Sequence, residues 1–172
     1  MATQIRVATI ADHVALADLW GEADAFHHAA LPRIYAPPPD PARSSEVIAA
    51  ILDDPDQGLL VACDEERPVG LVHVTLRERR PPMLPKRFAV VEAIVVAAAH
   101  RGTGIGRSLM EAAHRWAGAR GAVEIWLDVG EFNAGAIGFY EALGYETVSH
   151  RMRREFDAFS VDGRSQQTSQ TD

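Results

Sequence analysis

Three glycines alternate with other residues in the segment HRGTGIGR, which spans residues 100–107. Glycines let the backbone approach a ligand closely, so that several N–H groups can point at one spot, where a following helix adds about half a positive charge. Such an arrangement binds phosphate groups. The same glycines also suit a plain turn between a strand and a helix. Arg107 stands where a dinucleotide fingerprint needs glycine, and the Gly-Lys-Ser/Thr of a Walker loop is absent, so neither of those phosphate loops is present.

Two carboxylates lie where they could take a proton from a substrate. Glu92 is the one ionisable residue in the apolar run 88–96, where burial would raise the pKa of its carboxyl group and make it a better base. Asp128 comes near the end of a second apolar run, 123–129. Either side chain could instead pair with an arginine, and Asp128 could lie in solvent. Glu92 is the first candidate for the base. Asp128 ranks below it, because a carboxylate at the open end of a strand is more often solvated.

Asn133 and Tyr140 fall on one expected helix, over residues 133–143. Asn133 has the side chain of a good helix N-cap. Tyr140 shares an apolar face with Ala136, Phe139 and Leu143, so periodicity alone makes it a half-buried packing residue.

The seven histidines show no spacing typical of metal ligands. His27 and His28 are adjacent, so a helix cannot direct both toward one ion. One of them is expected to line a substrate pocket, with Tyr35 and a proline-rich loop as its wall. His73 is expected to be a core histidine with satisfied hydrogen bonds. The single cysteine, Cys63, shows no nucleophile pattern, excludes an internal disulfide and favours a reducing cytoplasm.

The apolar periodicity predicts the elements that must position these side chains. Strands are expected at residues 5–8, 59–63, 69–77, 88–96, 123–129 and 145–156, and helices at about 10–30, 45–52, 104–120 and 133–143. Thr9 and Asp12 form a capping box at the start of the first helix. Prolines at positions 37–39 and 41 forbid regular structure between the first two helices. A second proline-rich loop covers residues 79–85.

The resulting order is β-α-α-β-β-β-α-β-α-β. An antiparallel meander comes first, and a parallel crossover near the end places the third helix against the sheet. The sequence therefore predicts a mixed α/β fold in one domain over residues 1–159, followed by a polar, disordered tail over residues 160–172. At 172 residues, the chain is long enough to bury an apolar core without disulfides or metals.

The charge balance bears on the kind of partner. Seventeen Lys and Arg against 24 Asp and Glu give a formal net charge of −7. Such a surface disfavours nucleic acid, whose binding depends on neutralised phosphates, and fits a cationic small molecule or peptide better. The apolar runs are too short to cross a membrane, and residues 1–14 lack the pattern of a secretory signal. We therefore expect a cytoplasmic protein with no membrane or nucleic-acid partner.

The glycine segment and its surroundings resemble the GCN5-related N-acetyltransferase (GNAT) family. The family signature, Arg/Gln-x-x-Gly-x-Gly/Ala after a strand, matches RGTGIG at residues 101–106. A second family element, Asn-x-x-Ala-x-x-Phe-Tyr-x-x-x-Gly-Phe/Tyr, is matched by Asn133, Ala136, Phe139, Tyr140, Gly144 and Tyr145. The best-matched region covers residues 88–146. Two motifs at the expected separation make the resemblance specific.

This resemblance implies the GNAT fold and acetyl-CoA as co-substrate. The pyrophosphate would lie on backbone N–H groups of the loop, and the pantetheine arm would pair with the exposed backbone of the preceding strand, which could also be plain core. The cofactor contacts implied are Ile94, Val95, Val96, Arg101, Gly102, Thr103, Gly104, Ile105, Gly106, Arg107, Asn133 and Tyr140.

The resemblance also implies acetyl transfer to a primary amine by direct attack, without a covalent enzyme intermediate. An alkylamine with a pKa of about 10.4 is protonated at neutral pH, so a base must remove a proton. Spermidine/spermine-type relatives have a Glu base at the position of Glu92, although Ala93 stands where they often have Asp. The ribosomal-protein N-terminal acetyltransferases have a Glu base at the position of Asp128. Tyr140 matches the family's general acid, which returns a proton to the CoA thiolate.

A catalytically silent acyl-CoA-binding regulatory module is the alternative. The presence of Glu92, Asp128 and Tyr140 together favours an enzyme. The acceptor stays open between a small amine, an amino acid, an antibiotic and a protein N-terminus. By analogy with the fold, the last strand could mediate a homodimer.

Overall fold

The computed structural model describes residues 3–84 and 86–155. One sheet contains β1 (Gln4–Val7), β2 (Gln57–Asp64), β3 (Arg67–Glu78), β4 (Arg87–Val96) and β5 (Ile125–Leu127), in that order. The first four strands form an antiparallel meander, and β5 pairs with β4 in parallel. The chain passes from β4 to β5 through α3 (Ile105–Gly118), which is the predicted crossover.

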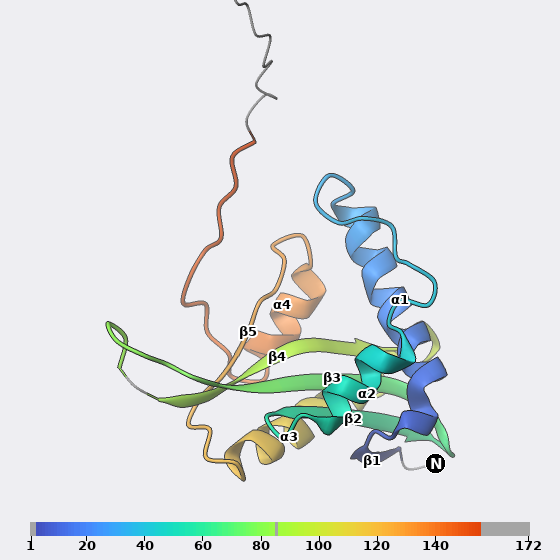
Figure 1. Cartoon of the computed structure of the whole chain (residues 1–172). Helices are drawn as coiled ribbons and strands as arrows, with labels where there is room; N and C mark the ends of the chain where they lie inside the picture. The colour runs from blue at the N-terminus through green and yellow to red at the C-terminus, as the bar shows by residue number, and fades with distance from the viewer. Residues whose placement is uncertain (1–2, 85, 156–172) are drawn as a thin grey trace, which may run out of the picture.

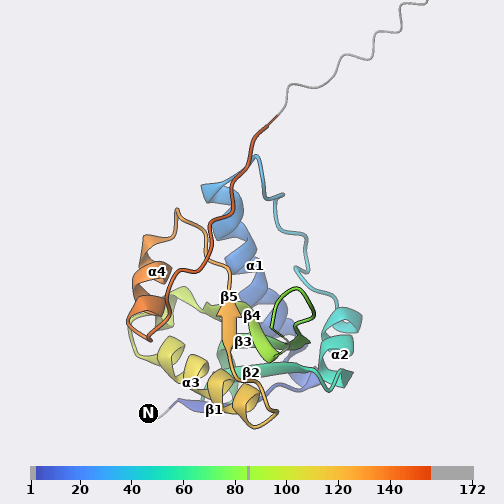
Figure 2. The same cartoon turned by 90° about the vertical axis from the view of Figure 1, so that its left-hand side faces the viewer.

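Helices cover both faces of the sheet (Figure 1). The helices α1 (His13–Ala30) and α2 (Ser45–Asp53) pack on one face, whereas α3 and α4 (Ala134–Glu141) pack on the other. In Figure 2, α3 and α4 lie to the left of the strands and α2 lies to the right. Two short 3-10 turns, Ile10–Asp12 and Ala98–His100, precede α1 and α3. This arrangement confirms the mixed α/β prediction. No helix in the described part of the chain is long and apolar enough to cross a membrane.

The start of α1 is tied to β1 through Asp12, which is only 7% exposed. Arg6 donates two hydrogen bonds of 2.7 Å to the Asp12 carboxylate. The backbone N–H of Thr9 donates a third, at 2.8 Å, within the predicted capping box. The hydrogen-bonded Arg6 guanidinium lowers the pKa of Asp12.

Strand β4 carries a bulge at Glu92. His73 of β3 pairs with Ala93, and the next residue, Val74, pairs with Val91, which leaves Glu92 as an extra residue without a partner opposite it.

The bulge changes which face of the sheet alternate residues occupy. Before it, Val91 packs in the core cluster against α3. After it, Val95 packs in the cluster against α1 and α2, although four residues of regular strand would have kept both on one face. Both faces of β4 carry apolar side chains that pack in the two core clusters, as its continuous apolar run predicted, although most residues of the strand are only partly buried.

The last part of the chain differs from the prediction. Strand β5 covers three residues of the expected strand 123–129. Residues 145–155 form no strand, so the prediction of a strand over 145–156 is wrong for those residues, and residue 156 lies outside the described part. The apolar side chains of this segment do not pack against the rest of the protein: Val148 is 58% exposed and Met152 is 92% exposed. The expected homodimer relied on this last strand, which residues 145–155 do not form. The predicted tail, 160–172, also lies outside the described residues.

Candidate active site

A cleft of about 920 Å³ opens between the C-terminal half of α1, the sheet and the N-terminal end of α3. Its volume is that of a typical small-molecule site. Except for Thr103, all the predicted site residues line it: Glu92, Ile94, Val95, Val96, Arg101, Gly102, Gly104, Ile105, Gly106, Arg107, Asp128, Asn133 and Tyr140. The structure therefore brings the two sequence motifs into one cavity.

The glycines of the loop have distinct structural reasons. Gly102 and Gly104 have φ angles of +76° and +89°, in the left-handed region that favours glycine. Gly104 is also the N-cap residue of α3, so backbone N–H groups without helical partners follow it. A Cβ atom on Gly106 would lie 3.4 Å from Phe139 Cζ, so this glycine allows α3 and α4 to approach each other.

The side chains of the loop brace its backbone. Arg101 Nε donates to the Val96 carbonyl oxygen at 2.9 Å, and Arg101 Nη2 lies 3.6 Å from Glu22 Oε2. Thr103 Oγ1 donates to the His100 carbonyl oxygen at 2.6 Å, which explains why its side chain does not line the cleft. The Arg107 side chain is exposed at the start of α3.

The strands β4 and β5 part at the cleft. Their parallel ladder ends at the pair of Val91 and Leu127. Beyond that pair, Ile94, Val95 and Val96 line the cavity on one side and residues 128–130 line it on the other. A ligand can therefore enter between the two strands and reach the strand backbone.

Asn133 and Tyr140 come from opposite ends of α4. Asn133 Oδ1 accepts a hydrogen bond of 3.1 Å from the Ala136 N–H, which confirms the predicted N-cap. The Tyr140 ring is half-buried between Phe139 and Tyr145, with ring centroids 5.3 and 5.8 Å away. Burial raises the pKa of its phenol. Tyr140 is thus both a packing residue and a residue of the cleft.

Glu92 is exposed, so the expectation of a buried carboxylate at this position is wrong. Its Oε1 accepts a hydrogen bond of 2.6 Å from Arg77 Nη2 on the neighbouring strand. The cause is the bulge, which leaves Glu92 without a partner opposite it and presents its side chain at the surface. Pairing with an arginine, which the sequence had left open as the alternative for Glu92, is the arrangement in the structure.

Asp128 directly follows β5, and its side chain is 85% exposed. Its Oδ2 lies 3.4 Å from Arg151 Nη2 in an exposed ion pair. Such a pair contributes little to stability. Asp128 therefore lies at the outer edge of the cleft, in the solvated position expected for a carboxylate at the end of a strand.

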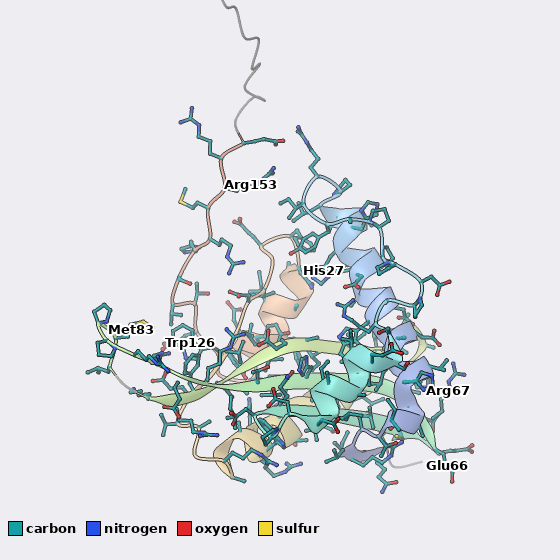
Figure 3. All side chains as sticks on the ribbon, viewed as in Figure 1. His27, Glu66, Arg67, Met83, Trp126 and Arg153 are labelled. Carbon is teal, nitrogen blue, oxygen red and sulfur yellow. The ribbon has the colours of Figure 1, made fainter. Side chains whose placement is uncertain are left out.

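His27 lines the cleft beside Tyr35, as predicted. Figure 3 shows His27 on the part of α1 that lies beside α4. The two ring centroids are 5.1 Å apart, and the Phe132 ring meets His27 edge-on at 5.9 Å. His27 Nδ1 donates to the Ala23 carbonyl oxygen at 2.8 Å. His28 instead donates to the Tyr35 carbonyl oxygen at 2.7 Å, which holds the proline-rich connection near α1.

The sequence did not identify several other residues of the cleft. His73, expected in the core, lines it together with Asp24 and Arg43. Arg43 Nη1 donates to Asp24 Oδ2 at 2.9 Å, so the connection between α1 and α2 is fastened to α1 inside the cavity. The alternation of β3 could have placed His73 on the α1 face. The position of Arg43 depends on a loop, for which periodicity gives no signal.

Comparisons with known proteins agree with this architecture. The model of the acetyltransferase (GNAT) family matches residues 24–145. Streptothricin acetyltransferase from Streptomyces lavendulae is 49% identical over 55 residues, which are 32% of this chain and 29% of that protein. The match thus spans less than a third of the relative's length.

Solved structures show the same fold over nearly the whole chain. A mutant of the BH1408 protein from Bacillus halodurans matches with a TM-score of 0.84 and 26% identity, over 89% of this chain and 99% of that one. The aminoglycoside N-acetyltransferase AAC(6')-Iy in complex with CoA matches with a TM-score of 0.68 and 17% identity, over 90% of this chain and 99% of that one. By the family match over residues 24–145, the chain belongs to the GNAT acetyltransferase family.

Proposed function

We propose that the protein is an acetyl-CoA-dependent N-acetyltransferase that acylates a primary amine of a small molecule or peptide by direct attack. The observation that carries this proposal is that one cleft holds the glycine loop, the parting of β4 and β5, and ionisable side chains on both sides. The GNAT family uses acetyl-CoA, which supplies an activated acyl carbon as its thioester.

The loop residues fit the cofactor. The left-handed glycines at 102 and 104 and the N-terminus of α3 present backbone N–H groups and partial positive charge to a pyrophosphate. Arg101 and Arg107 add two positive side chains to this end of the cleft. The backbone of Ile94–Val96 would hold the pantetheine arm, and Asn133 would contact it from the other side.

The other end of the cleft fits an amine. Asp24, Glu92 and Asp128 line the cleft. Each carboxylate pairs with an arginine and can also accept a hydrogen bond from an ammonium group. We propose that Glu92 binds the acceptor, because it stands at the bulge, near the parting of the strands, whereas Asp128 lies further out in solvent. Positioning the amine against the thioester would supply much of the rate.

Tyr140 would donate a proton to the departing sulfur. Because burial raises the pKa of its phenol, Tyr140 keeps its proton at neutral pH and can donate it. A CoA-binding module without turnover would need the loop but neither Tyr140 nor Glu92, so the presence of both side chains in the cleft favours the enzyme.

The proposal is tested in two stages. Thermal unfolding is measured with acetyl-CoA, with CoA and with NADH as control, because a ligand that binds the native state raises the melting temperature. We expect a shift with both CoA species and none with NADH. Release of CoA thiol from acetyl-CoA is then measured with a panel of amines, including streptothricin and aminoglycosides, which the names of the similar proteins suggest. A CoA shift without thiol release from any amine would support the silent binding module instead.

A further inference from the structure

His73 lies on β3 directly opposite Ala93 of β4, beside the bulge at Glu92. Its side chain is half-buried and lines the cleft. The Trp20 ring of α1 meets the imidazole edge-on, with 6.3 Å between the centroids. The imidazole therefore belongs to the wall that the sheet forms on the α1 side of the cleft.

Two hydrogen bonds in series assign the tautomer of His73. Gln57 Nε2 donates to Asp54 Oδ2 at 2.9 Å, because a carboxylate oxygen can only accept. This bond fixes the orientation of the Gln57 amide, whose Oε1 then accepts from His73 Nε2 at 2.7 Å. Nε2 therefore carries the proton, and Nδ1 keeps its lone pair. Within residues 3–84 and 86–155, Nδ1 has no hydrogen-bond partner and is not sealed from solvent.

Charged groups reach His73 from three elements. Glu92 on β4 favours the imidazolium, whereas Arg43 from the connection before α2 disfavours it. Asp54, at the end of α2, acts through Gln57. Burial is the largest influence and lowers the pKa of His73. The ring is therefore neutral at pH 7, with a lone pair able to accept a proton.

Glu92 is differently engaged. Its Oε1 accepts the 2.6 Å hydrogen bond from Arg77, so this oxygen is directed at a guanidinium. The carboxylate supplies negative charge beside His73, which is what an incoming ammonium group needs for binding. The two neighbours thus divide the work: Glu92 binds the cation and His73 is available for its proton.

We propose that His73 Nδ1 accepts the proton of the acceptor ammonium group, an inference that rests on the acetyltransferase function proposed above. An N–H bond of the ammonium breaks, and its electron pair on nitrogen forms the new C–N bond at the thioester carbonyl. The C–S bond breaks with its electron pair on sulfur, and the surplus proton on nitrogen reaches sulfur through the Tyr140 hydroxyl. His73 releases its proton to solvent. One ammonium and one thioester thus give one amide, one thiol and one proton.

The first test replaces the base and keeps its hydrogen bond. In His73→Gln, the new amide can still donate to Gln57, but no imidazole is present. We expect kcat/KM for the amine to fall about 10²-fold at pH 7. The loss should shrink toward pH 10, where free amine forms unaided. The limb that follows the imidazole should be absent, and kcat/KM should rise with pH as the amine itself loses its proton. Equal losses at pH 7 and pH 10 would overturn the role of His73.

The second test keeps His73 and changes its partner. In Gln57→Glu combined with Asp54→Asn, a carboxylate accepts the same Nε2–H without facing a second carboxylate at residue 54. It stabilises the imidazolium, so the pKa of His73 rises. We expect the acidic limb of kcat/KM to move to higher pH by the same amount as the NMR titration of the His73 ring in the ligand-free protein. An NMR titration that moves while the acidic limb stays in place would contradict the proposal.

The outcomes separate this inference from the proposed function. Wild-type protein that binds CoA and acetylates no amine of the panel would overturn both. Active wild-type protein with either contrary result above would overturn the role of His73 alone.

Discussion

Arg77 Nη2 and Glu92 Oε1 are 2.6 Å apart, which joins β3 to the bulged residue of β4 across the rim of the cleft. The pair keeps a carboxylate at the bulge of β4, where Glu92 is exposed. Glu92 also acts on the neighbouring His73 through its charge, so a variant of each residue is needed to distinguish amine binding from proton transfer.

For Glu92→Gln, we expect KM for the amine to rise about tenfold, because the ammonium loses its counter-charge. The acidic limb of kcat/KM should persist and move to lower pH, since the negative charge of Glu92 raises the pKa of His73. Steady-state kinetics between pH 5 and 10 check this. Disappearance of the limb in this variant would instead make Glu92 the base.

At Gly104, charge and shape can be separated. Asn and Asp are both tolerated at positive φ, so Gly104→Asn and Gly104→Asp should strain the loop to a similar extent. We expect Asp to bind CoA about tenfold or more weakly than Asn, because its charge repels the pyrophosphate. Calorimetric titration with CoA measures the difference. Equal affinities would place the pyrophosphate elsewhere.

Removing the Tyr140 hydroxyl should slow turnover far more than it weakens cofactor binding. For Tyr140→Phe, we expect kcat to fall about 10²-fold and Kd for CoA to change much less. Because burial raises the pKa of Tyr140, the wild-type protein should show no loss from phenol ionisation up to about pH 10.

Tyr145→Phe is the matched control for Tyr140. Its hydroxyl lies 2.8 Å from His114 Nε2 and does not line the cleft. Tyr145→Phe should therefore keep the wild-type kcat. Equal losses in the two variants would indicate a packing effect in place of proton donation.

Asp12 should make stability depend on acid pH. Because Arg6 lowers the pKa of Asp12 in the folded protein, this stabilisation is fully present above the unfolded pKa of about 4 and is lost as the pH falls through the lower, folded value. Asp12→Asn should cost about 1.5–3 kcal/mol at pH 7. In urea unfolding, the difference in the free energy of unfolding between Asp12→Asn and wild type should become smaller at acid pH. Asp128→Asn removes an exposed ion pair and should leave the free energy of unfolding unchanged at every pH.

Gly58 should be the most sensitive glycine of the sheet. A Cβ there would lie 2.5 Å from Trp116 Cε2, so Gly58→Ala must displace a large ring of α3 and should cost about 1–3 kcal/mol. Gly138 is exposed within α4 and has open space around it. Gly138→Ala should therefore gain about 0.5–1 kcal/mol by helix propensity. Thermal unfolding of both variants compares the two effects.

Features that depend on neighbouring residues were predictable from the sequence. The spacing of Gly102, Gly104 and Gly106 predicted a tight turn before a helix, and Asn133 predicted a cap, because both depend on local backbone conformation. The meander and the crossover followed from the apolar periodicity of long elements.

Features that depend on distant parts of the chain were not predictable. The pairing of Glu92 with Arg77 requires a bulge, which an apolar run on both sides does not mark. The expected last strand is absent for a similar reason. A strand must pair with the edge of a sheet, and the apolar alternation of residues 145–155 does not indicate whether such an edge is available. His73 was assigned to the core because its residue type, taken alone, gave no sign of the cleft.

The bulge at Glu92 also sets how β4 can tolerate insertions and deletions. Deleting one residue between Val91 and Val95 would restore strict alternation and turn one half of the strand over. Since both faces of β4 are apolar, the inverted half would still bury apolar side chains, and burial alone would barely distinguish the two registers. A shortened β4 would therefore keep a foldable sheet and move Glu92 and the loop at 101–107 out of alignment with His73. The number of residues in this strand is thus fixed by the geometry of the cleft more than by the stability of the core.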